Sequence, residues 1–104
     1  MTSLFDDVPS HLSSEIFEDL VNAKGVRVER ILSYGHTSPE KGWYDQEENE
    51  WVLVLEGYGV LEFEDRRRIK LKAGDYLNIE PHEKHKVVET SSNTVTIWLA
   101  IFYQ

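Results

Sequence analysis

The sequence contains no cysteine and is poor in positive charge. Without cysteine, the chain has no disulfide, no thiolate nucleophile and no cysteine-zinc site, so these classes of chemistry are excluded. Its 11 Lys and Arg residues stand against 19 Asp and Glu residues, which gives a formal net charge of −8 at pH 7. Because phosphate binding relies on clustered Lys and Arg, we expect no nucleic-acid partner.

Long hydrophobic runs are also missing. No stretch approaches the roughly 20 apolar residues of a membrane-spanning helix, and we expect no membrane partner. The start of the chain, Met1 to Asp7, lacks the basic region of a signal peptide, so we expect a cytoplasmic protein. The length of 104 residues predicts one domain with a single core.

The first 25 residues carry a pattern that predicts a short amphipathic helix. Leu12, Ile16 and Leu20 are spaced by four, Ser13 or Ser14 is placed to cap a helix, and Gly25 is placed just after its end. We therefore expect residues 1–25 to be a helical segment packed on the outside of a barrel formed by residues 26–104.

The remainder of the chain predicts short strands separated by turn residues. The expected strands cover residues 26–32, 43–45, 51–55, 60–64, 69–71, 76–79, 85–90 and 94–103. With no helix between them, they favour an all-β antiparallel sandwich or barrel. The run 51–55 is continuously apolar, which predicts a strand buried on both faces. The last strand is apolar on both sides, so its outer face should pack on the N-terminal helix or on a second copy, and we expect a homodimer.

Two polar side chains at strand ends are candidates for a site inside this barrel. Glu50 shares the face of Val52 by the alternation of a strand, and His85 shares the face of Val87. A carboxylate and an imidazole from two strands make a minimal metal site, to which Asp45 or Gln46 could add a third ligand. A paired rim carboxylate and a satisfied core histidine are the alternative interpretations.

These residues lie in a pattern that resembles the small single-domain cupins of the conserved-barrel type. Gly57 follows Glu50 by seven positions, as in the first cupin motif, and the segment from Gly74 to His85 has the Gly and His spacing of the second. Sixteen residues separate Gly57 from Gly74. The resemblance implies a double-stranded β-helix (jelly-roll) barrel. Both histidines of the first motif are missing from this sequence. The resemblance therefore implies only His85 and Glu50 as metal ligands, with Asp45 or Gln46 as a substitute for the missing histidines.

The expected ligand set is one imidazole with two oxygens, which suits Mn(II) or Fe(II), with Zn(II) or Ni(II) as alternatives. Three functions stay open at this point. The first is a metal-dependent enzyme that acts on a small polar metabolite as an oxygenase, isomerase or decarboxylase. The second is a module that binds or senses a small ligand without turnover. The third is a metal-free scaffold dimer in which Glu50 and His85 only bond to each other. Aromatic residues that could wall a pocket, or belong to the core, are Trp43, Tyr44, Trp51 and Trp98.

Overall fold

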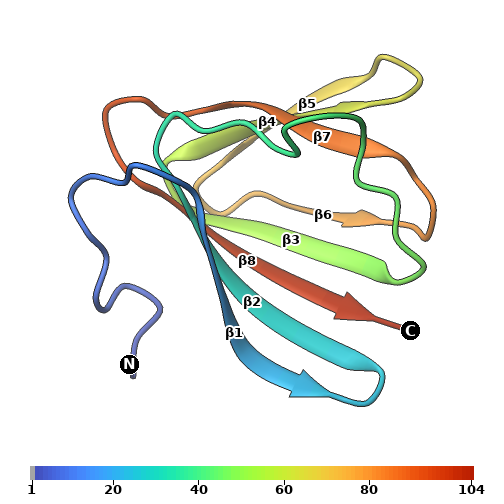
Figure 1. Cartoon of the computed structure of the whole chain (residues 1–104), viewed down its shortest axis with the longest axis horizontal. Helices are drawn as coiled ribbons and strands as arrows, with labels where there is room; N and C mark the ends of the chain where they lie inside the picture. The colour runs from blue at the N-terminus through green and yellow to red at the C-terminus, as the bar shows by residue number, and fades with distance from the viewer. Residues whose placement is uncertain (1) are drawn as a thin grey trace.

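The computed structural model describes residues 2–104, which form two antiparallel β-sheets facing each other (Figure 1). One sheet has five strands in the order β1-β2-β8-β3-β6, and the other has three in the order β5-β4-β7. The strands are β1 (Ile16–Ala23), β2 (Val26–Ser33), β3 (Asn49–Glu56), β4 (Tyr58–Phe63), β5 (Arg68–Lys72), β6 (Tyr76–Ile79), β7 (His85–Thr90) and β8 (Thr96–Tyr103). The all-β jelly-roll prediction is confirmed. No helix able to cross a membrane is found among the described residues.

The prediction of an N-terminal helix is wrong. Residues Ile16–Ala23 form β1, which pairs antiparallel with β2 across a tight turn that Gly25 completes at a φ of 80°. The spacing by four that suggested a helix is also two steps of strand alternation, so it does not distinguish the two structures. Pairing with β2 decides between them, and the domain boundary predicted after residue 25 falls within this hairpin.

The other predicted strands match the structure closely, with two differences. The stretch expected at residues 43–45 is reduced to an isolated bridge between Tyr44 and His85. The strand expected to be buried on both faces, now β3, alternates instead: Val52 and Val54 are buried, and Trp51 and Leu53 on the opposite face are only half-buried. One face of the five-stranded sheet is therefore partly open.

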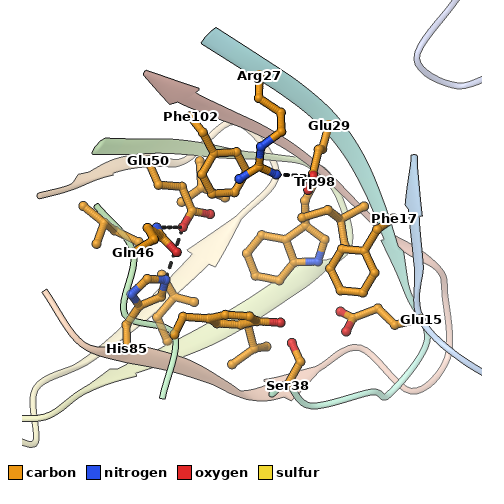
Figure 2. A pocket seen from close by; sticks show the side chains of 16 residues that line it. Glu15, Phe17, Arg27, Glu29, Ser38, Gln46, Glu50, His85, Trp98 and Phe102 are labelled. Atoms are coloured by element: carbon orange, nitrogen blue, oxygen red, sulfur yellow. Dashed lines mark hydrogen bonds and ion pairs between the residues drawn. The ribbon is translucent and has the colours of Figure 1, made fainter. Parts of the chain in front are cut away.

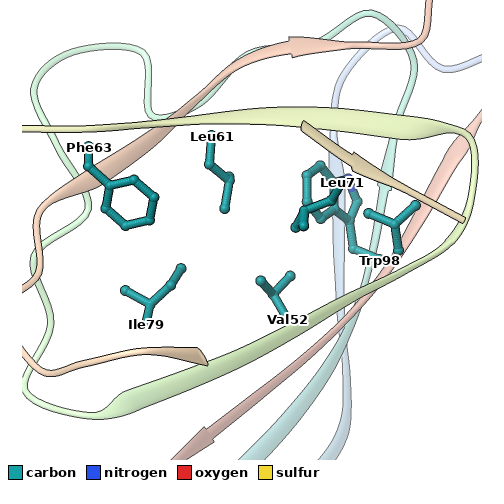
Figure 3. Packing of buried hydrophobic residues seen from close by; sticks show 7 residues of the cluster. Val52, Leu61, Phe63, Leu71, Ile79 and Trp98 are labelled. Carbon is teal, nitrogen blue, oxygen red and sulfur yellow. The ribbon is translucent and has the colours of Figure 1, made fainter. Parts of the chain in front are cut away.

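The main core lies between the two sheets. Figure 3 shows Leu61 and Phe63 of β4 facing Val52 and Ile79 of the larger sheet. Apolar burial of this kind is the main stabilising contribution to such a barrel. The full set of buried core residues is Val52, Val54, Leu61, Phe63, Leu71, Ile79 and Trp98.

Trp98 belongs to this core and depends on a glycine opposite it. A Cβ atom on Gly59 would lie only 2.1 Å from the Trp98 ring, so only glycine leaves room for the indole there. This close approach fixes the ring at the edge of the space between the sheets.

The N-terminal segment before β1 covers part of the outer face of the larger sheet. Arg30 of β2 points to that face and is 1% exposed. Its guanidinium donates hydrogen bonds to the carbonyl oxygens of Leu4 (3.1 Å) and Asp6 (2.5 Å), and it forms an ion pair with Glu18 (2.7 Å). Leu12 packs nearby in a second buried cluster with Leu32, Val95 and Ile97. A buried charge with complete pairing thus ties the segment to the sheet.

Candidate functional site

A cavity of about 300 Å³ lies between the two sheets beside the main core. Its volume is at the lower end of the range for small-molecule sites in proteins, about 300–1,000 Å³. Apolar side chains supply most of its surface, and polar side chains stand at its sides (Figure 2). The apolar lining residues are Phe17, Ile31, Val52, Leu61, Ile79, Val87, Trp98 and Phe102, and the polar ones are Glu15, Arg27, Glu29, Ser38, Tyr44, Gln46, Glu50 and His85.

Glu50 and His85 meet at one side of this cavity, as the strand alternation predicts. Glu50 lies in β3, His85 begins β7, and the two side chains are almost completely buried, with residue exposures of 8% and 3%. The Nε2 atom of His85 is 3.2 Å from Oε1 of Glu50. Gln46 donates a hydrogen bond from its side-chain amide to the same oxygen at 3.0 Å.

The hydrogen bonds of His85 fix the number of protons that the pair holds. Its Nδ1 atom is 2.9 Å from the carbonyl oxygen of Glu83, which can only accept, so Nδ1 carries a proton. Nε2 and the Glu50 oxygen can then bond only if one further proton lies between them. The donated hydrogen bond from Gln46 favours the charged carboxylate. The pair is therefore an imidazolium and a carboxylate that share one ionisable proton at the cavity wall.

The pKa of His85 agrees with this assignment. Burial opposes the charged imidazolium, but the hydrogen bonds to Glu50 and to the Glu83 carbonyl, with the negative charge of Glu50, outweigh it. The pKa of His85 is therefore raised above its ordinary value of 6.5. A histidine that keeps its proton near neutral pH can act as a general acid.

Asp45 does not join Glu50 and His85. Its carboxylate pairs with the exposed His82, with Oδ1 at 2.8 Å from Nδ1, and Asp45 is absent from the cavity lining. Gln46 follows it in the chain and points the other way, into the cavity. Of the four predicted ligands, the structure therefore brings three together: Glu50, His85 and Gln46.

These three side chains do not fit the resident metal that the sequence resemblance implies. Nε2 of His85 and Oε1 of Glu50 are bonded to each other, and Gln46 turns its amide nitrogen, which cannot ligate, toward them. Open iron and manganese sites usually combine at least three imidazole or carboxylate ligands. No group of three or more His, Asp or Glu residues within residues 2–104 is placed to hold a metal ion. We therefore assign no metal to this site and no chemical step to a metal.

Sequence reasoning missed the polar residues on the opposite side of the cavity. Arg27 and Glu29 of β2 face inward and form an ion pair with each other, and Arg27 also binds Glu48 at 3.1 Å. Glu15 and Ser38 also line the cavity, and Figure 2 shows them near each other, on the other side of Phe17 from Glu29. The alternation of β2 is misleading here, because its more apolar face, with Val26, Val28 and Leu32, is the outer one and its more polar face lines the cavity.

The predicted aromatic wall is present in part. Tyr44 and Trp98 line the cavity, with Phe17 and Phe102 beside them. Trp51 instead lies on the outer face of β3, where its ring stacks 5.5 Å from that of Tyr76. Trp43 lies outside the cavity lining, and the ammonium of Lys86 sits 4.4 Å from its ring centre.

Comparison with known proteins identifies the family of the chain and structures that resemble it. The family model described as "Cupin domain" matches residues 31–102. A crystal structure from Ralstonia eutropha JMP134, provisionally named a mannose-6-phosphate isomerase, is 37% identical, with a TM-score of 0.93, over 100% of this chain and 97% of its own. No curated protein matches the chain.

More distant structures share the fold alone. A cupin superfamily protein from Desulfitobacterium hafniense DCB-2 is 18% identical with a TM-score of 0.77, over 92% of this chain and 83% of its own. A transcriptional regulator of the HTH_3 family from Vibrio cholerae is 16% identical with a TM-score of 0.69, over 86% of this chain and 51% of its own. The same barrel thus occurs in proteins with different names, and the function has to be argued from the site.

Proposed function

The chain belongs to the cupin family, and from that premise we propose that its barrel binds a small molecule and exchanges a proton with it through the Glu50–His85 pair. The observation that carries the proposal is the position of this pair. It is buried, it holds one ionisable proton, and it faces a cavity of about 300 Å³. Buried titratable pairs that face a cavity are characteristic of binding and catalytic sites.

The pair has the parts that acid-base chemistry needs. The imidazolium of His85 can give its Nε2 proton to a ligand atom within reach, and the carboxylate of Glu50 stabilises the charged form before transfer. Gln46 and the Glu83 carbonyl hold the two side chains in place. Of the reaction types left open by the sequence, isomerisation by proton transfer needs one group that gives the ligand a proton, here the His85 imidazolium, and one that takes a proton from it, here the Glu50 carboxylate. We therefore favour an isomerase-type reaction.

The name of the Ralstonia protein does not transfer directly to this site. A sugar phosphate brings two negative charges, which proteins usually bind with several free Arg or Lys side chains. Among residues 2–104, Arg27 is the one Arg that lines this cavity, it is already paired with Glu29 and Glu48, and no Lys lines the cavity. A ligand without a phosphate is the better fit.

The proposal is tested by a ligand-observed NMR screen of small fragments against three proteins. We expect some fragments to bind the native chain. E50Q should no longer bind the fragments that contact the Glu50–His85 pair, because the amide removes the negative charge that holds the imidazolium. H82N is the matched control, since it disrupts an exposed His-carboxylate pair outside the cavity. Fragments that bind E50Q as well as the native protein, or no bound fragments at all, would contradict the proposal.

We also propose that the protein forms a homodimer through the outer face of the five-stranded sheet. Val21, Val28, Ile101 and Trp51 are paired residues on four neighbouring strands, and they form a continuous apolar row across that face. Val21 is 48% exposed and Tyr76, on the same sheet, is 65% exposed. A second copy would bury this row symmetrically.

A further inference from the structure

The charges that line the cavity are unbalanced. Glu15, Glu29 and Glu50 contribute three carboxylates, and the cationic groups are Arg27 and the protonated His85. Each of these cations already has a partner in the cavity wall: Arg27 pairs with Glu29, and His85 pairs with Glu50. Glu15 remains as the carboxylate whose charge these two cations do not neutralise.

Glu15 is held at the cavity by a hydrogen bond. Its Oε2 atom accepts a hydrogen bond of 2.6 Å from the hydroxyl of Ser33, which in turn accepts one of 3.2 Å from the indole nitrogen of Trp98. Among residues 2–104, no Lys, Arg or His forms an ion pair with Glu15. Figure 2 shows it across the cavity from Glu50, with the Trp98 ring between them.

Aromatic rings occupy the space between these carboxylates. Phe17, Tyr44, Trp98 and Phe102 line the cavity, and the ring of Phe102 already holds a cation, since the Arg27 guanidinium lies 3.9 Å from its centre. The faces of aromatic rings carry partial negative charge and attract cations, an effect that grows where water is excluded. The lining therefore offers an apolar surface and a negative potential together.

We propose that the ligand of this cavity is a small organic ammonium ion with an apolar body, whose charged nitrogen pairs with Glu15 while its body packs against Trp98 and Phe17. This inference rests on the proposed function, because it names the class of molecule that the same cavity takes. The apolar lining accepts a single ring or a branched alkyl group. A negatively charged molecule of the same shape would meet the uncompensated carboxylate instead.

The pKa of Tyr44 reflects the same negative potential. Burial raises the pKa of Tyr44, and a hydrogen bond with Ser38 partly offsets that rise. The negative charges of nearby carboxylates raise this pKa further, and the three that act are Glu15, Glu50 and Glu29. The cavity thus disfavours a further negative charge.

Three probes of nearly the same shape test the inference: benzylamine, which is protonated at pH 7, benzyl alcohol, which is neutral, and benzoate. Their affinities for the full chain are measured by NMR titration at low ionic strength. We expect benzylamine to bind at least about tenfold more tightly than benzoate, with benzyl alcohol between them, because a charge-assisted hydrogen bond is about twice as strong as a neutral one. Added salt should weaken benzylamine binding and leave that of benzyl alcohol nearly unchanged.

The variant E15Q locates the effect. It should remove most of the advantage of benzylamine over benzyl alcohol, while E80Q, which removes the same charge from an exposed position outside the cavity, should preserve it. Benzoate or benzyl alcohol binding as tightly as benzylamine, or an unchanged preference in E15Q, would overturn the inference and leave the proposed function standing. If none of the three probes binds and the fragment screen also finds no ligand, both proposals fail.

Discussion

Replacing one member of the Glu50–His85 pair by leucine is expected to destabilise the fold by about 3 kcal/mol. Breaking a buried ion pair by removing one partner costs about 3–5 kcal/mol, because it leaves an uncompensated buried charge. We take the lower end because Glu50 keeps 8% exposure and faces a cavity. For a domain of this size, whose stability is about 5–15 kcal/mol, E50L and H85L should each lower the melting temperature by roughly 12 °C or more.

The double variant E50L/H85L provides the critical comparison. Two leucines leave no buried charge, so the double variant should be at least about 2 kcal/mol more stable than the sum of the single losses predicts. The assay is urea unfolding followed by tryptophan fluorescence. D45N, which removes the carboxylate from the exposed pair with His82, is the control and should remain close to the native protein. If the losses of unfolding free energy in E50L and H85L simply add up in the double variant, or if each loss is near zero, the idea of a buried charged pair is refuted.

The loss of stability in H85L should depend on pH. Because the pKa of His85 is raised in the folded state, its charged form stabilises the fold fully below its unfolded value near 6.5. That stabilisation is lost as the pH rises through the folded pKa. The difference in unfolding free energy between the native chain and H85L should therefore be larger at pH 6 than at pH 9. A difference that grows with pH would show that the pKa is lowered instead.

Three further predictions concern the N-terminal segment, the outer face of the larger sheet and metal binding. R30M should loosen the N-terminal segment from the sheet, because the carbonyl oxygens of Leu4 and Asp6 lose their hydrogen-bond donor. We expect faster hydrogen exchange or proteolysis confined to residues 2–15. Unchanged rates would contradict this prediction. I101K should convert a dimer to a monomer in light scattering, because the charge would lie in the apolar row; a native protein that is already monomeric would refute the dimer. Adding Mn(II), Fe(II), Ni(II) or Zn(II) should leave the melting temperature unchanged, whereas stoichiometric metal that E50Q abolishes would show that a metal belongs at Glu50 after all.

The sequence predicted the barrel well because strand alternation and turn residues are local signals. The predicted first and last residues of β6 and β7 agree with the structure. Glu50 and His85 lie on the internal faces that strand alternation assigns to them. The helix at the N-terminus was the main error. Its spacing by four fits a strand equally well, and only the pairing of β1 with β2, which in turn pairs with the distant β8, decides.

The composition of the site was less predictable for a similar reason. Asp45 and Gln46 are adjacent in the chain, but one turns to His82 and the other into the cavity, a choice made by the fold of the loop. Arg27 faces the cavity because β2 pairs with β8 in one register rather than another. A shift of one residue would have turned it outward, and no local pattern contains that information.

The most direct test of the central claim is an NMR titration of the His85 ring. We expect a proton on Nδ1 throughout, held by the Glu83 carbonyl, and a pKa for loss of the Nε2 proton above 6.5 in the native chain. In E50Q that pKa should fall, because burial then acts without the carboxylate. A native His85 that is already neutral well below pH 6.5, or a pKa that E50Q leaves unchanged, would contradict the shared proton on which the proposed function rests.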